Sequence, residues 1–190
     1  MTPGRALDAA FAAAPRRAFL PEGQQRYADQ DRPLPIGWQQ TNSQPRTVRQ
    51  MLALLDVRPG LRILDVGCGS AWTTALLAHL VGPQGEVVGV ELVPQLVEFG
   101  RRNLAVLPLA QARIEAANPD VLGRPDEAPF DRVLVSAGAT GLPDALVEQL
   151  GVGGVLVVPV RGVLTEVRRT AAGTRVAEHG AYSFVPLVGG

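Results

Sequence analysis

Short runs of Val, Ile and Leu alternate with helical segments through the middle of the chain. The apolar runs predict strands at 62–66, 86–91, about 112–115, 131–135 and 154–159. The segments between them predict helices at 73–81, 94–104 and 144–150. Continuous apolar strands separated by helices are typical of a parallel sheet that is covered on both faces. The pattern therefore predicts a doubly wound α/β fold with a mostly parallel, Rossmann-like sheet.

The N-terminal part has a different pattern. Apolar residues at helical spacing predict an amphipathic helix at 6–14 and another at 46–55. Between them, residues 32–45 are rich in Pro, Gln and Gly. Irregular loops of this length are uncommon in compact domains unless they are functional. We therefore interpret residues 32–45 as a candidate lid.

The C-terminal part again predicts strands. Two apolar stretches, at 163–170 and 181–185, lie on either side of Ala171-Ala172-Gly173. The separation is too short for a crossover helix, and parallel neighbours need one. We therefore expect these strands to add to one edge of the sheet in antiparallel orientation.

The size and charge of the chain narrow the class of protein. A length of 190 residues with 46% hydrophobic residues is typical of one globular domain. A net charge of zero argues against nucleic-acid and membrane partners. The single cysteine and the two separated histidines, His79 and His179, predict neither an internal disulfide nor a metal site. These features, and the lack of a long apolar run, predict a cytoplasmic protein.

A glycine-rich turn follows the first strand of the predicted sheet. It reads Asp65-Val66-Gly67-Cys68-Gly69-Ser70-Ala71, and Trp72 stands where a dinucleotide fingerprint needs glycine. The pattern D-x-G-x-G-x-[GA] instead favours a site for S-adenosylmethionine. Glu91, 22 residues beyond Gly69, ends the second strand, and its carboxylate can accept both ribose hydroxyls. The combination predicts a nucleoside-cofactor site.

Four other residues invite a chemical role. Asp131 opens a strand, where an aspartate usually hydrogen-bonds nearby backbone. Cys68 is interpreted as a small residue in a tight turn, and His79 as a helix residue whose hydrogen bonds are satisfied. Trp38 is equally compatible with stacking on a substrate and with anchoring the loop.

Short blocks of sequence recur along nearly the whole chain in the order of a known family. They are, in order, Arg17-Ala18-Phe19-Leu20-Pro21, Tyr27-Ala28-Asp29, Leu34-Pro35-Ile36-Gly37, Gln40-Thr41-Asn42-Ser43-Gln44-Pro45, the loop from Asp65 to Ala71, Ala128-Pro129-Phe130-Asp131, Gln149-Leu150 with Gly153-Gly154, and Phe184-Val185-Pro186-Leu187. In these blocks the chain resembles the protein-L-isoaspartate O-methyltransferases. The most specific block is 34–45, because methyltransferases in general share the glycine loop but not that segment.

The resemblance implies transfer of a methyl group from S-adenosylmethionine to the carboxylate of an isoaspartyl residue, as a step of protein repair. It implies catalytic roles for Thr41 and Ser43, at the meeting point of cofactor and acceptor. The residues expected to bind the cofactor are Asp65, Gly67, Cys68, Gly69, Ser70, Glu91, Leu92 and Asp120. Those expected to bind the substrate are Ile36, Trp38, Asn42, Ser136, Ala137 and Gly138.

Two departures from the family pattern leave alternatives open. Gln39 stands where the family usually has Gly, and Asn118-Pro119-Asp120 replaces Gly-Asp-Gly, which shifts the acid by one residue. An enzyme that methylates aspartate in one dedicated ribosomal peptide is the first alternative. A non-catalytic cofactor- or peptide-binding module is the second, and an NAD oxidoreductase the third.

We expect one monomeric domain over residues 1–190. It would comprise a helical lid segment at 1–55, a cofactor-binding core at 56–160 and C-terminal strands at 161–190. Its partner would be an isoaspartyl- or aspartyl-containing protein or peptide.

Overall fold

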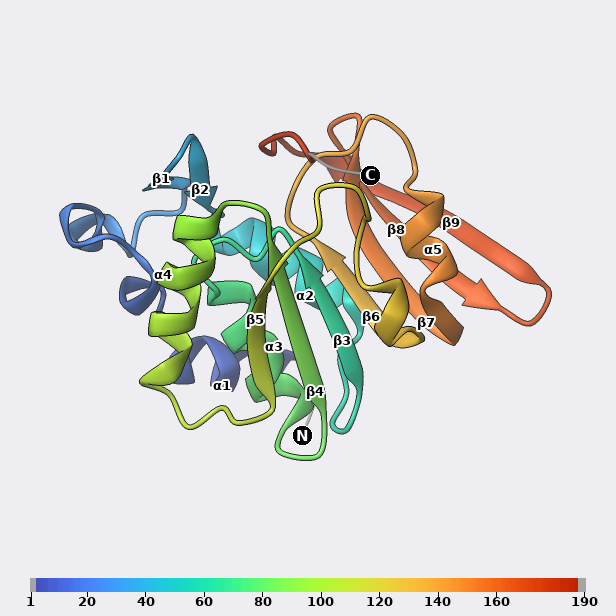
Figure 1. The fold of residues 1–190 in the computed structure, drawn as a ribbon, viewed down its shortest axis with the longest axis horizontal. Coiled ribbons are helices and arrows are strands. Elements are labelled where there is room, and N and C mark those ends of the chain that lie inside the picture. Colours follow the sequence, from blue (N-terminus) through green and yellow to red (C-terminus); the bar gives the residue numbers. More distant parts are fainter. Residues whose placement is uncertain (1–2, 188–190) are drawn as a thin grey trace.

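The computed structural model describes residues 3–187, in which seven strands form one twisted sheet (Figure 1). The spatial order is β5-β4-β3-β6-β7-β8-β9. The first five of these are parallel, and β8 and β9 are antiparallel. This confirms the predicted doubly wound fold. The strands are β3 (Arg62–Val66), β4 (Glu86–Glu91), β5 (Ala112–Ala116), β6 (Phe130–Val135), β7 (Leu150–Val160), β8 (Val163–Thr170) and β9 (Gly173–Ala181).

The two faces of the sheet are covered unequally. Alternate strand residues such as Ile63 and Val87 share one apolar cluster with α1 (Pro3–Ala13), α2 (Pro45–Leu55), α3 (Trp72–Val81) and α4 (Pro94–Ala105). The other alternate set, including Leu64 and Val88, packs with Leu146 of the short helix α5 (Asp144–Glu148). Successive side chains of a strand point to opposite faces, which explains the two clusters.

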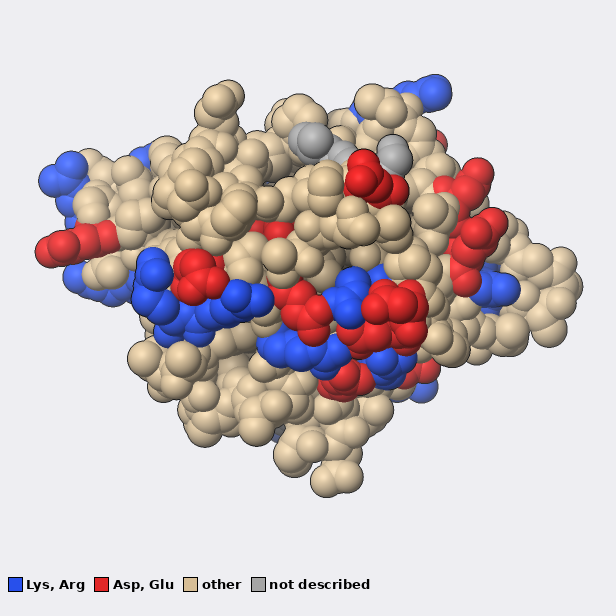
Figure 2. All heavy atoms as spheres, in the orientation of Figure 1, with Lys and Arg blue, Asp and Glu red and all other residues tan. Residues whose placement is uncertain are grey.

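Ion pairs cover the part of the second face over β3, β4 and β5. Arg62, Glu86 and Arg113 come from these strands, and Glu127 comes from the 3₁₀ turn η3 (Pro125–Glu127). Figure 2 shows the result as a band of mixed positive and negative charge. These ion pairs, rather than a helix, therefore cover this part of the face. The band contains side chains of both charges rather than of one sign.

The predicted lid is not an irregular loop. Within residues 32–45, β1 (Leu34–Gly37) and β2 (Gln40–Asn42) form an antiparallel hairpin, which follows the 3₁₀ turns η1 (Arg16–Phe19) and η2 (Glu22–Tyr27). Leu34 and Ile36 are buried whereas Pro35 and Gly37 are exposed. This period of two is the strand signal that the abundance of Pro and Gly obscured.

Two predictions in the second half need correction. The last strand is β9, which lies N-terminal to the predicted 181–185, because the short turn after β8 brings Arg175 opposite Arg168. The predicted helix 144–150 ends at Glu148, because Leu150 pairs with Phe130 in the sheet. The end of the predicted segment 161–190, residues 188–190, lies outside the described residues.

The segment after β9 does not form a strand but contacts the loop that follows β6. Gly138 donates its N–H to the carbonyl of Val185 at 2.7 Å, and Leu187 donates to the carbonyl of Gly138 at 2.8 Å. Figure 1 shows this segment and the β1–β2 hairpin on either side of the carboxyl ends of β3 and β4. None of the helices among residues 3–187 is long and apolar enough to cross a membrane.

Candidate active site

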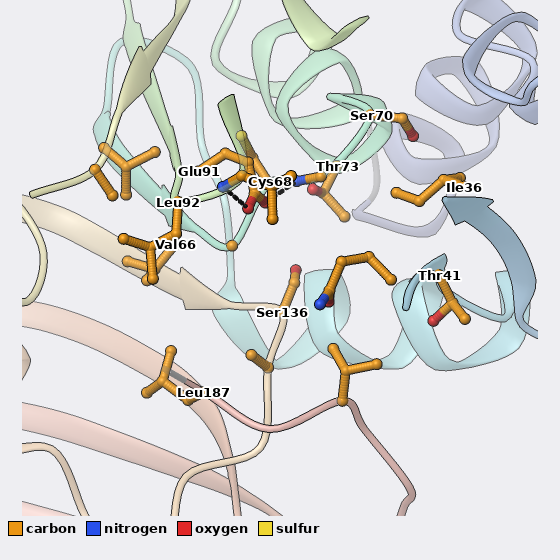
Figure 3. A pocket seen from close by; sticks show the side chains of 18 of the residues that line it. Ile36, Thr41, Val66, Cys68, Ser70, Thr73, Glu91, Leu92, Ser136 and Leu187 are labelled. Atoms are coloured by element: carbon orange, nitrogen blue, oxygen red, sulfur yellow. Dashed lines mark hydrogen bonds between the residues drawn. The ribbon is translucent and has the colours of Figure 1, made fainter. Parts of the chain in front are cut away.

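A cavity of about 370 Å³ opens at the carboxyl ends of β3, β4 and β6, where the strand order reverses at β3. Open parallel sheets bind ligands at this place. Figure 3 shows Glu91 and Leu92 on one side of the cavity and Ile36 and Thr41 of the hairpin on the other. The lining includes Ile36, Gln40 to Ser43, Val66 to Ser70, Glu91 to Pro94, Ala117, Asn118, Ser136, Ala137 and Val185 to Leu187.

The glycine loop turns in the left-handed region of backbone space. The φ angles are +71° at Gly67 and +53° at Gly69, which glycine adopts without strain. A Cβ at residue 69 would also lie 3.1 Å from Cδ1 of Ile36. The third position of the pattern, Ala71, has φ +72° and precedes α3. The loop therefore turns sharply and leaves its backbone close to the hairpin.

Glu91 presents its carboxylate on the cavity wall. Oε2 accepts the N–H of Gly69 at 2.9 Å, and Oε1 accepts the N–H of Val93 at 3.0 Å. Each carboxylate oxygen can accept a further hydrogen bond. The side chain is thus oriented by backbone and retains acceptor capacity toward the cavity, as a pair of ribose hydroxyls requires.

Asp65 lies beneath the loop rather than on the cavity wall. Its Oδ2 accepts the hydroxyls of Thr73 and Thr74, both at 2.7 Å, and its Oδ1 has no partner among residues 3–187. Burial raises the pKa of Asp65 to about 6, and the charge of Glu91 adds to the effect. These contacts join the end of β3 to the start of α3, so Asp65 shapes the loop.

Thr41, Ser43 and Ser136 line the cavity and also a second, adjoining cavity of about 480 Å³. The two spaces therefore meet at hydroxyl groups. The Ser43 side chain makes no hydrogen bond to another residue of the described part of the chain. Its position leaves the hydroxyl available to a ligand.

The start of α2 is capped from another segment. Asp31 Oδ1 accepts the N–H of Arg46 at 2.9 Å, and Oδ2 accepts the Gln44 amide at 2.9 Å. The backbone bond, followed by the Gln44 bond, lowers the pKa of Asp31. Ser43 is therefore not the cap of this helix.

Comparison with known proteins identifies the family. The model of the protein-L-isoaspartate(D-aspartate) O-methyltransferase family matches residues 4–190. The chain belongs to this family. A protein-L-isoaspartate O-methyltransferase of Pyrococcus horikoshii is 38% identical over 96% of this chain and 84% of its own. One from Methanopyrus kandleri is 43% identical over 92% and 80%.

A solved structure supports the same family. It is described as a Plasmodium falciparum protein-L-isoaspartate O-methyltransferase in complex with S-adenosyl-L-homocysteine. Its TM-score to this chain is 0.85 at 26% identity, covering 96% of this chain and 89% of that chain. A second structure called protein-L-isoaspartate O-methyltransferase has a TM-score of 0.87 at 23% identity, covers 97% of this chain and 61% of that chain, and supports the fold alone.

The structure brings most of the residues that the family resemblance implies to one cavity. Four lie elsewhere: Asp65 beneath the loop, Trp38 at the hairpin tip with 50% of its surface exposed, and Gly138 and Asp120 outside the lining. Asn118 lines the cavity instead, and its Oδ1 accepts the N–H of Asp120 at 3.0 Å. Their roles in binding stay predictions.

Other sequence interpretations can be compared with the contacts. Asp131 accepts the N–H of Arg62 at 2.8 Å, which confirms its backbone role. Cys68 is buried on the cavity wall, and burial raises the pKa of its thiol. The buried Nε2 of His79 has no hydrogen-bond partner among residues 3–187, which contradicts the satisfied histidine expected there. Sequence reasoning missed Gln40 and Pro186 as lining residues, although both lie in blocks that carry the family resemblance.

Proposed function

We propose that this protein methylates the free carboxylate of isoaspartyl residues in damaged proteins or peptides, with S-adenosylmethionine as the methyl donor. The observation that carries the proposal is the meeting of two cavities at Thr41, Ser43 and Ser136. One cavity holds the oriented Glu91 carboxylate, which suits a nucleoside. The other is lined mostly by polar residues, among them Gln44 and Arg46, which suits a peptide. Family membership supports both assignments.

The residues of the first cavity fit the cofactor. Glu91 would accept the two ribose hydroxyls, and the backbone of Gly67 to Ser70 would lie against the rest of the molecule. Apolar side chains such as Val66 and Leu92 offer a surface for the adenine ring. When bound, S-adenosylmethionine supplies an electrophilic methyl group attached to a positively charged sulfur.

The acceptor side needs alignment rather than a base. A carboxyl group with an ordinary pKa near 4 is ionised at neutral pH and is already a nucleophile. Hydroxyls of Thr41 and Ser43 would orient it without the strong ion pair that an arginine forms, so its oxygen stays reactive. A carbon–oxygen bond forms as the carbon–sulfur bond breaks, and no proton moves. Alignment and exclusion of water would supply the rate.

We also propose that residues 1–190 act as one domain and as a monomer. Each of the predicted segments 1–55, 56–160 and 161–190 contributes to the wall of the same cavity, which supports a site complete within one copy. The net charge of zero supports an acceptor other than nucleic acid or a membrane surface. A cytoplasmic location stays a prediction from cysteine content.

The test uses labelled S-adenosylmethionine with matched isoaspartyl and aspartyl peptides. We expect methylation of the isoaspartyl peptide alone. Ser43→Ala should lower kcat about tenfold or more and leave cofactor affinity nearly intact, because the lost contact orients the acceptor. Thr174→Ala, on the exposed strand β9, is the control and should behave like the parent.

Each other outcome contradicts part of the proposal. Preference for the aspartyl peptide would mean that repair is wrong and would favour a dedicated peptide acceptor. Failure to bind S-adenosylmethionine would favour a non-catalytic module. An unchanged kcat in Ser43→Ala would remove this residue from the acceptor site.

A further inference from the structure

The guanidinium of Arg16 is buried at the base of the hairpin, with 6% of the residue exposed. Its hydrogen bonds use every N–H group of the side chain. Nε donates to Oδ1 of Asn42 at 2.7 Å. Nη1 donates to the carbonyls of Gln30 at 3.0 Å and Ala28 at 3.4 Å, and Nη2 to those of Arg32 at 2.8 Å and Asn42 at 2.9 Å.

Neutral oxygens thus hold a buried positive charge. A buried charge is costly unless its hydrogen bonds are complete, and here they are. Burial lowers the pKa of Arg16 to about 10, so the group stays charged at neutral pH, and the nearby Asp31 favours the charged form. The acceptors lie on the loop that enters the hairpin and on the last residue of β2. The Arg16 side chain therefore binds both the segment that enters the hairpin and the residue that ends it.

Arg16 also sets the orientation of the Asn42 amide. Because a guanidinium only donates, the atom of Asn42 that faces it must be the oxygen, and the NH₂ group must point the other way. There, Nδ2 donates to Oγ of Ser70 at 3.2 Å. The Ser70 carbonyl in turn accepts from Nδ2 of Asn103 in α4 at 2.9 Å. A continuous set of contacts thus joins Arg16 through the hairpin to the glycine loop.

The two linked residues both belong to the candidate site. Asn42 and Ser70 line the cavity, and Asn42 lies between Thr41 and Ser43 in the chain. Arg16 therefore binds the backbone carbonyl of the residue that stands between the two hydroxyl-bearing residues. A displacement of Arg16 would shift the acceptor side relative to the cofactor side.

We propose that Arg16 is a positioning residue for methyl transfer, which holds the Thr41–Ser43 segment in register with the glycine loop through Asn42. The proposal rests on the proposed function. Arg16 itself lines neither cavity, so it would act only through the segments that it holds. Its effect is on alignment, and a misplacement of about 1 Å can lower a rate about a hundredfold.

The first experiment compares Arg16→Gln and Arg16→Lys with Arg17→Gln, an exposed arginine in the same turn. Both Arg16 variants should lower kcat about tenfold to a hundredfold. The lysine variant keeps the charge but has too few donors for all the acceptors. The Kd for S-adenosylhomocysteine should change less than about threefold, because the sheet positions Glu91 and the glycine loop. Arg17→Gln should match the parent.

Asn42→Leu tests whether Arg16 acts on the reaction through the Asn42 amide. It keeps the Asn42 backbone carbonyl for Arg16 but removes the amide that reaches Ser70. Its kcat should fall, and the loss in Arg16→Gln/Asn42→Leu should be smaller than the product of the single losses, because both changes remove one connection. This variant and Arg16→Lys decide the question if Arg16→Gln does not fold.

A purely structural role predicts a different result. Folded Arg16→Lys with a lower Tm and an unchanged kcat overturns the proposal, and so does a rise in KM alone. If the parent protein methylates no isoaspartyl peptide, the proposed function fails. Amide hydrogen exchange then still tests the positioning: faster exchange confined to residues 34–43 in Arg16→Gln supports it, and unchanged exchange there overturns it.

Discussion

The two walls of the candidate site are held in place by different forces. The cofactor wall consists of the ends of buried parallel strands, where Val66 pairs with Val90 on one side and Val135 on the other. The proposed acceptor wall is a two-stranded hairpin, whose position depends on a small apolar cluster around Leu34 and Ile36 and on polar contacts from Arg16 and Asp31. Two large apolar clusters and a continuous ladder determine the first wall, whereas one small apolar cluster and a few polar side chains determine the second.

This difference predicts different stabilities. Opening the cofactor wall requires breaking the central sheet, so it should cost as much as unfolding the protein. An isolated hairpin is marginally stable in water, so the acceptor wall should open at lower cost. A site that must admit a peptide and then exclude water benefits from this arrangement.

The largest effect should come from the sheet core. Leu64 in β3 is fully buried, and Leu64→Ala should lower the free energy of unfolding by about 2–5 kcal/mol through lost burial and a cavity. Urea denaturation measures this, with Val106→Ala, 79% exposed, as the control. A loss under about 1 kcal/mol would contradict the view that the sheet carries the global stability.

A pH-dependent effect should appear at Asp65. The pKa of about 6 in the folded protein lies above the ordinary aspartate value of about 3.9. The protonated form therefore stabilises the fold at low pH, and this contribution is lost as pH rises from about 4 to about 6. The loss amounts to about 3 kcal/mol. Asp65→Asn cannot titrate, so its stability relative to the parent should improve between pH 4 and pH 7. If urea denaturation gives the same stability difference between variant and parent at both pH values, the raised pKa of Asp65 is wrong.

A smaller effect on binding should come from Glu91. Glu91→Ala removes acceptors that hold the glycine loop and would hold the ribose, and such charge-assisted bonds contribute about 1.5–3 kcal/mol each. Cofactor affinity should fall at least about tenfold by calorimetry. The matched control is Glu98→Ala on the exposed face of α4. Unchanged affinity in a folded Glu91 variant would remove this residue from the cofactor site.

The smallest effect should come from the hairpin turn. Trp38 and Gln39 have φ angles of +50° and +60°, which cost energy for residues other than glycine. Gln39→Gly removes that strain but adds freedom to the unfolded chain, so we expect a net gain of about 0.5 kcal/mol. Amide hydrogen exchange in the hairpin should therefore be slightly slower in Gln39→Gly than in the parent. It should be faster in Gln40→Gly. Slower exchange in both variants would argue against backbone strain.

The hairpin is one place where sequence analysis was wrong. The period of two at Leu34 and Ile36 was present in the sequence, but Pro35 and Gly37 suggested a loop. Gln39 has a left-handed φ that glycine adopts without strain. The position of the last strand was wrong because β9 is mostly polar and exposed, so no apolar run indicated it, and only its pairing with β8 places it.

The sequence by itself determined the parallel sheet and the cofactor wall. Runs of Val, Ile and Leu indicate strands that are buried on both faces. The glycines and Glu91 lie at the ends of two strands that are neighbours in such a sheet. Only the tertiary structure decided what holds the acceptor wall. The contacts of Arg16 with Asn42 and of Asp31 with Arg46 join residues 26 and 15 positions apart. The local pattern of apolar and polar residues indicates which residues are buried. The partner of a buried polar group depends instead on where distant segments meet in space.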